Sequence, residues 1–170
     1  MKEHSEKTKL SIGSTPWGGL GVIAKEAIQK GEEVLRIHND SVIGLHTALT
    51  HPRFGKAFSS FYYQQSKLSE YALIALTLLW EKFDNERWSA FAPFLATLPS
   101  IEEFSHPVLL SRDDLLQLYG SSLLDDVLAL NATLHSEFEA SCALIQSNRH
   151  LRSLFTSSLL TYPRFLVVLR

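Results

Sequence analysis

The chain lacks the residues from which small proteins build crosslinks and metal sites. Cys142 is the only cysteine among 170 residues, so no internal disulfide can form and no second thiol is available for a zinc site. The histidines stand at positions 4, 38, 46, 51, 106, 135 and 150, never at the i, i+3 or i+4 spacing that presents two ligands from one helix face. We therefore expect no metal ion, and a single unpaired thiol suits a reducing compartment.

The chain also lacks an excess of positive charge and a long apolar run. Its 16 Lys and Arg against 18 Asp and Glu give a formal net charge of −2, so we expect no nucleic-acid partner. The longest apolar run, residues 71–80, is shorter than the ~20 residues that span a bilayer, so we expect no membrane partner. Residues 1–10 resemble neither a secretory signal nor a transit peptide. The expected location is intracellular, cytoplasmic or nuclear.

What the chain does contain is enough apolar material for one core. It is 45% hydrophobic and 20% charged, proportions that are typical of globular proteins. Two short stretches rich in Val, Ile and Leu, Gly21–Ala24 and Glu33–Ile37, lie on either side of a segment centred on Lys30 and Gly31, and both predict strands. A small β unit is therefore expected near the N-terminus.

Helical periodicity begins at Ser66. Apolar residues at intervals of three and four predict a helix over residues 66–83. A second stretch, residues 87–98, has the same period, but Pro93 predicts a break or kink inside it. The aromatic residues of this stretch follow the helical spacing and are interpreted as core anchors rather than a stacking platform: Trp88, Phe91 and Phe94.

The second half of the chain carries helix caps as well as periodicity. A Ser-x-x-acid cap at residues 111–114 and a stop at Gly120 predict a short helix between them. A serine cap at residues 121–122 starts the longest predicted helix, which runs on towards Cys142 and Ile145. Residues 161–170 have the character of a helix start and stop among apolar residues, which indicates a continuation downstream.

No catalytic residue is predicted. The acidic pairs at residues 113–114 and 125–126 follow serines in first helical turns, where negative charge complements the helix N-terminus, so capping explains them better than catalysis. His46 and His51 are interpreted as surface or loop histidines. Cys142 is interpreted as a buried, inert thiol, because no neighbouring charge would lower its pKa. No Gly-x-Ser-x-Gly elbow occurs.

The most informative stretch is a glycine loop at residues 18–21. Gly18, Gly19 and Gly21 surround Leu20 and allow backbone geometry and close ligand approach that a Cβ would block. Spacing alone leaves two interpretations open. The glycines form a plain turn before a strand, or their main-chain groups meet a small molecule.

A resemblance to a known family follows the order of these motifs. Gly19-Leu-Gly-Val-Ile-Ala-Lys25, then Gly31-Glu-Glu-Val-Leu35, resembles the opening of SET-domain protein methyltransferases. Residues 88–99, Trp-Ser-Ala-Phe-Ala-Pro-Phe-Leu-Ala-Thr-Leu-Pro, resemble part of the helical insertion of the Rubisco large-subunit methyltransferase-like branch, as do residues 73–82 and 118–124. The resemblance runs from about residue 17 to residue 170.

The resemblance implies transfer of a methyl group from S-adenosylmethionine to a lysine, or less often a histidine, of a protein substrate. It implies that main-chain groups of Gly18 and Leu20 meet the polar end of the cofactor, with Gly19 and Gly21 giving access. Gly18 stands where the family often has Glu, which removes a side chain but need not remove a backbone contact. The chemistry needs mainly alignment and a neutral amine.

Several family motifs are not found in this chain. They are a Ser-Arg element, an Asn-His motif that binds S-adenosylmethionine, and a tyrosine lining the lysine channel. Because Phe165–Arg170 resembles the start of the last insertion helix, we expect an incomplete and inactive fragment, a truncated gene product or a splice form, that binds the cofactor weakly or not at all. The alternatives are a non-catalytic helical protein-interaction module derived from a SET protein and an unrelated helical adaptor.

The expected architecture is α+β, a truncated SET domain. Residues 1–16 are expected to form an N-terminal extension and residues 17–40 the N-terminal part of the SET β unit. Residues 41–170 are expected to form the helical SET insertion, which is incomplete because the C-terminal SET half is absent.

Overall fold

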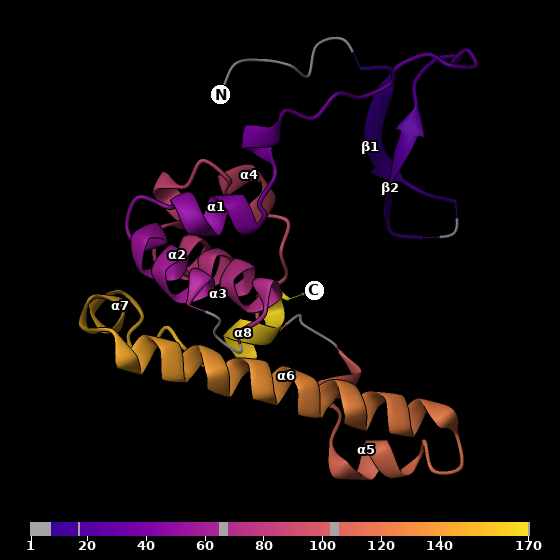
Figure 1. Ribbon diagram of the computed structural model, residues 1–170. Helices are drawn as coiled ribbons and strands as arrows, with labels where there is room; N and C mark the ends of the chain where they lie inside the picture. The colour runs from indigo at the N-terminus through magenta and orange to yellow at the C-terminus, as the bar shows by residue number, and fades with distance from the viewer. Residues whose placement is uncertain (1–7, 17, 65–67, 103–105, 170) are drawn as a thin grey trace. The chain divides into compact units, whose positions relative to one another are not determined.

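The computed structural model of the chain describes residues 8–16, 18–64, 68–102 and 106–169 (Figure 1). The chain divides into two compact units, an N-terminal unit (Met1–Val42) and a helical unit (Ile43–Arg170). One small antiparallel sheet and a majority of helices make the architecture mixed, in agreement with the α+β class expected from the sequence. Each unit is described by itself.

The N-terminal unit is built on a two-stranded antiparallel hairpin (Figure 1). Strand β1 (Leu10–Ser14) pairs with β2 (Leu20–Ala24) from Leu10 opposite Ala24 to Ser14 opposite Leu20. Both strands alternate apolar with small or polar residues, the period of an extended chain. A short 3₁₀ helix, η1 (Asn39–Ser41), follows near the end of the unit.

Residues 25–34 fold back beside the start of β1. The Thr8 hydroxyl donates a hydrogen bond to the Val34 carbonyl at 2.8 Å. The Lys9 ammonium donates to the Ala27 carbonyl at 3.0 Å and forms a 2.7 Å ion pair with Glu32. Side chains, rather than a strand ladder, therefore hold this segment against the hairpin.

The strand predicted at Gly21–Ala24 is confirmed and begins one residue earlier. The second predicted strand, Glu33–Ile37, is wrong, because these residues have no strand structure. The partner of β2 is instead β1, which lies within residues 1–16, the stretch expected to be an extension. Strand β1 directly precedes β2 in the sequence and is joined to it by a tight turn. Pairing β2 with β1 is therefore more local than pairing it with residues 33–37.

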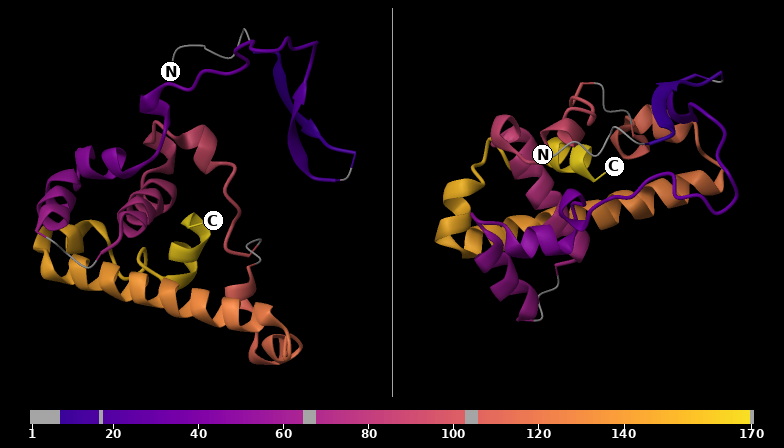
Figure 2. Two further views of the ribbon diagram at one scale, coloured as in Figure 1. Left: turned by 45° about the vertical axis from the view of Figure 1, so that its right-hand side comes forward. Right: turned by 90° about the horizontal axis from the view of Figure 1, so that it is seen from above.

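The helical unit contains eight α-helices and two 3₁₀ helices among its described residues. They are α1 (Leu45–Thr50), α2 (Gly55–Tyr63), α3 (Glu70–Phe83), η2 (Glu86–Trp88), α4 (Ala92–Leu95), η3 (Pro107–Leu109), α5 (Arg112–Leu116), α6 (Ser122–Ser147), α7 (Arg149–Leu154) and α8 (Tyr162–Val168). Figures 1 and 2 show α6 as a long rod with α7 at one end and α5 at the other.

The core of the helical unit is centred on α3. Ser69 caps this helix by accepting a hydrogen bond from the Ala72 N–H at 3.1 Å. Nine of its residues are buried, on several sides of the helix. It packs against α1, α4, α6 and α8. The largest fully buried side chains of this core come from several helices and loops: Phe54, Phe58, Leu73, Leu76, Leu79, Leu95, Leu144, Leu151 and Phe165.

Two long helices agree with their predictions. The helix predicted over residues 66–83 is α3, which begins at Glu70; part of the predicted start, residues 66–67, lies outside the described residues. The longest predicted helix is α6, and the Ser121 side chain accepts a hydrogen bond from the Leu123 N–H at 3.2 Å as its cap. The short helix α5 is capped by Ser111, as predicted, and Gly120 follows it with φ of 86°.

The break predicted inside residues 87–98 is present, but it lies at Ser89 and not at Pro93. The chain forms the short η2 and α4, because Ser89 between them is extended and Pro93 lies in the first turn of α4. The interpretation of the aromatic residues as core anchors is wrong for Trp88 and Phe94, whereas Phe91 packs against the core. Trp88 is 78% exposed and Phe94 is exposed, while Phe91 is half-buried. No helix in the described ranges is long and apolar enough to cross a bilayer.

Candidate functional site

The glycine loop predicted as the cofactor site forms the turn of the β1–β2 hairpin. The Gly18 N–H donates to the Thr15 carbonyl at 3.1 Å and closes a four-residue turn with Pro16 at its second position. The Thr15 N–H donates to the Gly19 carbonyl at 3.0 Å, and the Thr15 hydroxyl donates to the Gly18 carbonyl at 2.6 Å. Thr15 thus fixes the loop through three hydrogen bonds.

Two of the glycines are required by the backbone. Gly18 has φ of 91° and Gly19 has φ of 78°, a region that residues with a Cβ rarely adopt. A Cβ built on either residue meets no atom within 4 Å, so the space beside the loop is open. The conformation, and not crowding, therefore selects glycine at positions 18 and 19.

Gly21 is required for a different reason. It lies in β2 opposite Gly13, and a Cβ at Gly21 would come within 2.6 Å of the Thr15 methyl carbon Cγ2. The space that the resemblance assigns to ligand access is thus occupied by the chain's own threonine. Gly21 lets Thr15 pack across the hairpin and does not open the loop.

The loop leaves a limited set of main-chain groups for a ligand. The Gly18 N–H is engaged with Thr15, and Leu20 lies in the ladder opposite Ser14. The Gly19 N–H has no partner among the residues that the structure describes. The Gly18 carbonyl accepts from one hydroxyl and keeps a second lone pair. Among the described residues the loop therefore offers one main-chain donor and one available main-chain acceptor.

The helical unit contains a buried hydrogen-bonded pair, His51 and Glu81, that the sequence did not indicate. His51 Nε2 lies 3.0 Å from Glu81 Oε1, and the two side chains are 8% and 7% exposed. The Arg53 N–H donates to His51 Nδ1 at 3.3 Å, so Nδ1 is the acceptor nitrogen and Nε2 carries the proton given to Glu81. His51 lies in the loop between α1 and α2, as one of its two interpretations predicted, but its side chain is buried and not at the surface.

Glu81 is held in its ionised form by its neighbours. Burial raises the pKa of this carboxyl, but hydrogen bonds from His51, Ser89 and Asn85 outweigh that effect and leave the pKa below its ordinary value. The Asn85 amide donates at 3.0 Å. The sequence feature that indicates a buried partner for Glu81 is its position directly after Leu78-Leu79-Trp80, because a charge within a buried helix needs buried partners.

Aromatic rings surround this pair. The His51 ring stacks on Phe54 with centroids 3.8 Å apart and meets Trp80 edge-on at 5.2 Å. Trp80 is buried, and its indole N–H has no hydrogen-bond partner within the described part of the chain. His51, Glu81 and Trp80 all line a pocket of about 370 Å³. The hydrogen bond between His51 and Glu81 ties the segment before α2 to α3.

The acidic residues after Ser111 and the Cys142 thiol have the structural roles expected from the sequence. Ser111 Oγ accepts from the Asp114 N–H at 3.2 Å, which makes these residues a cap. Burial, and to a smaller extent the charge of Glu139, raises the pKa of the Cys142 thiol. Cys142 is half-buried and stays protonated at neutral pH, so it is a poor nucleophile. The described residues contain no group of three or more His, Cys, Asp or Glu side chains placed to hold a metal ion.

Comparison with known proteins adds no family to this description. No protein-family profile matches the chain, and no curated protein and no solved structure is significantly similar to it.

Proposed function

We propose that the N-terminal unit carries the first part of the S-adenosylmethionine site of a SET-type protein methyltransferase. The observation that carries the proposal is the hairpin turn itself, in which Gly18 and Gly19 both have positive φ directly before β2. The resemblance to the SET family places its cofactor loop at the same four positions. A helical bundle without a hairpin at these glycines would have removed the basis for the proposal.

Within that site, the chain supplies main-chain groups and no reactive side chain. The free Gly19 N–H donates to an oxygen at the polar end of the cofactor, and the second lone pair of the Gly18 carbonyl accepts from its ammonium group. This differs from the roles drawn from the resemblance, which assigned the main-chain contacts to Gly18 and Leu20. S-adenosylmethionine, when bound, supplies the methyl group as a sulfonium. The proposed acceptor is a lysine of a protein substrate, with histidine the less favoured alternative.

The test is an NMR titration of the full ¹⁵N-labelled chain with S-adenosylmethionine. We expect weak, millimolar binding, because only one loop of the pocket is recognisable in this sequence. The amide resonances of Gly18, Gly19, Leu20 and Gly21 should shift, and those of α3 should not. Absence of loop shifts at saturating concentrations, or shifts spread evenly over the chain, would overturn the proposal.

A matched pair of variants separates the loop's role from its backbone strain. Gly19→Ala places a Cβ beside the free N–H and should abolish the shifts. Gly31→Ala is the control, because Gly31 also has positive φ (84°), also meets no atom within 4 Å of a built Cβ, and closes a turn outside the loop. It should leave the titration unchanged. Equal effects of the two variants would mean that strain, not contact, controls binding.

A second candidate is a non-catalytic helical protein-interaction module. It is favoured by one observation: the buried core cluster of the helical unit draws all of its residues from positions 48–168 and none from the hairpin. That unit can therefore bury an apolar core without a cofactor loop. If the titration leaves the loop unchanged while the helical unit binds a partner, this second function replaces the first.

A further inference from the structure

The helical unit has two adjoining pockets separated by the loop between α1 and α2. One, of about 370 Å³, is lined mainly by aromatic and uncharged side chains and is called the aromatic pocket. The other, of about 620 Å³, is called the basic pocket and includes Lys56, Ser59 and His150 among its lining residues. Thr50, His51, Pro52 and Arg53 line both. The two pockets therefore form one continuous surface around Arg53.

The aromatic pocket exposes an unusually large apolar side chain. Trp88 is 78% exposed at its rim, while Trp80 is buried in its wall. Pro52 and Phe91 add further apolar surface. Exposed tryptophan beside a concave apolar wall is the composition found at binding hot spots.

The basic pocket contains two cationic side chains, Arg53 from the segment just before α2 and Lys56 from the first turn of α2. His150 of α7 lines it as well. The His150 ring nitrogen Nε2 is 2.6 Å from the Arg53 carbonyl, which joins the two segments. None of the Arg or Lys side chains in this group forms an ion pair within the described ranges, and the lining of the basic pocket contains no carboxylate.

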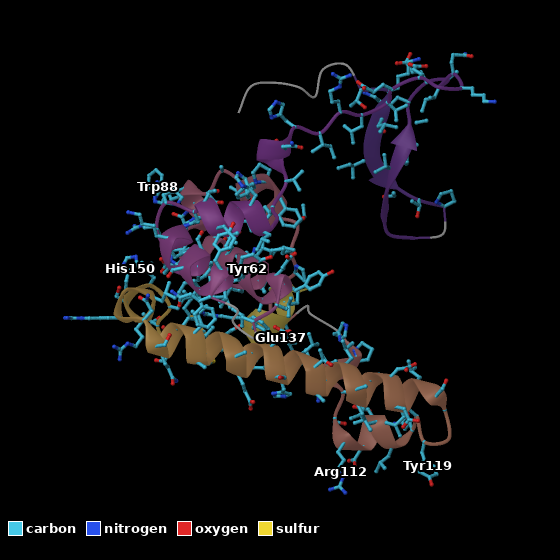
Figure 3. All side chains as sticks on the ribbon, in the orientation of Figure 1. Tyr62, Trp88, Arg112, Tyr119, Glu137 and His150 are labelled. Atoms are coloured by element: carbon cyan, nitrogen blue, oxygen red, sulfur yellow. The ribbon has the colours of Figure 1, made fainter. Side chains whose placement is uncertain are left out.

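Arg53 links the two pockets chemically as well as spatially. Its guanidinium lies 5.8 Å from the centre of the Trp80 ring, over the buried wall of the aromatic pocket. Figure 3 shows Trp88 and His150 at the same end of the helical unit, away from Arg112 and Tyr119 near α5. Trp88 and His150, which line the two pockets, thus lie at the same end of this unit.

We propose that this double pocket binds an acidic peptide segment of a partner protein, with an aromatic side chain of the peptide in the aromatic pocket and its carboxylates against the basic pocket. Glu81 fixes the orientation of the peptide. Its buried carboxylate lines the aromatic pocket and would repel an acidic group there. Glu86, close to Trp88, is already paired with Lys82 at 3.0 Å.

The chemistry favours an acidic peptide over a nucleic acid. The formal net charge of −2 gives no long-range attraction for a polyphosphate, and the cations form one group rather than a track that could follow a backbone. A short acidic segment with one anchor needs only one local group of cations and one pocket. The proposal is independent of methyl transfer and stands whether or not the hairpin binds S-adenosylmethionine.

The test is fluorescence anisotropy of the full chain with a dye-labelled heptapeptide, a tyrosine flanked by three glutamates on each side. We expect micromolar binding that weakens as salt rises, because the contacts with carboxylates are exposed. Replacing the peptide's glutamates by glutamine should abolish binding. Replacing its tyrosine by glycine should weaken binding about tenfold. No binding up to about 1 mM peptide, or equal binding of an oligothymidylate, would overturn the proposal.

Variants of the chain locate the site. Lys56→Glu should weaken binding of the peptide at least about tenfold, and Trp88→Ala should weaken it by about the same factor. The matched controls are Arg112→Glu and Tyr119→Ala, exposed residues at the opposite end of the unit, which should change the affinity less than about twofold. Circular dichroism melting curves check that each variant is folded. Equal losses in both groups would show that binding is non-specific and contradict the proposed site.

Discussion

The two units of this chain are stabilised by different means. In the N-terminal unit, a strand ladder and side-chain hydrogen bonds hold the backbone, and large apolar side chains such as Ile12 and Val22 remain 79% and 69% exposed. In the helical unit, Phe58, Leu76 and Phe165 are fully buried around α3. The N-terminal unit therefore depends on residues that suit the backbone conformation of the hairpin. The helical unit depends on side chains whose volumes fill its core.

The largest expected effect tests the core of the helical unit. Phe58→Ala removes a fully buried ring that contacts the rings of Phe54 and Phe155, and should lower the free energy of unfolding by about 3–5 kcal/mol. Ile12→Ala in the hairpin should cost less than about 1 kcal/mol, because the side chain is already exposed. Urea unfolding followed by circular dichroism measures both. Similar losses would erase the contrast between the units.

The buried pair should give the next largest effect. His51→Ala leaves the Glu81 carboxylate without its closest partner and should destabilise the helical unit by about 3 kcal/mol at neutral pH. The measurement is the urea midpoint at pH 7. Glu139→Gln, which neutralises an exposed carboxylate, is the control and should leave the midpoint unchanged.

The same pair predicts a pH dependence with a definite sign. Because the folded pKa of Glu81 lies below its ordinary value of 4.5, its stabilising contribution is complete above the unfolded pKa and is lost as pH falls through the folded pKa. Glu81→Gln should therefore be less stable than the parent at neutral pH, with the difference shrinking in acid. A difference that grows on acidification would contradict the ionised assignment.

A smaller effect is expected in the hairpin turn. Gly19→Ala forces a Cβ into positive φ and should cost the hairpin about 1 kcal/mol, with no change in the helical unit. Amide hydrogen exchange in β2 should quicken about fivefold. Unchanged exchange in β2 would mean that the turn tolerates a side chain and that glycine is not needed there for its conformation.

The smallest effect is expected at the surface of the N-terminal unit. Arg36 and Glu33 form a 2.7 Å ion pair, but both side chains are largely exposed to solvent. Arg36→Ala should leave the hairpin amide exchange and the urea midpoint without measurable change. A clear loss of stability would show that side-chain pairing contributes more to this unit than its exposure indicates.

Sequence reasoning succeeded where local chemistry decides the structure. The apolar spacing of α3 and α6, the serine caps at Ser111 and Ser121, and the strand before Ala24 all follow from interactions within a few residues. It failed where distant partners decide. The segment at Glu33–Ile37 has the composition of a strand but no ladder partner among the described residues. Helices α1 and α2 lack a period strong enough to be recognised before they pack on each other.

The functional residues divide in the same way. The positive φ of Gly18 and Gly19 follows the pattern of their sequence, but the role of Thr15 in filling the space beside Gly21 depends on cross-strand geometry. The pairing of His51 with Glu81 spans 30 residues, and the exposure of Trp88 depends on the break before α4. Spacing along one helix reveals neither the place of Thr15, nor the His51–Glu81 pair, nor the exposure of Trp88.

The 26 residues of α6 form a rod about 39 Å long, at 1.5 Å of rise per residue. That length exceeds the diameter of a small domain, about 30 Å. A globular partner of that size bound near α7 would therefore leave the far end of α6, around Tyr119, uncovered, with room there for a second protein.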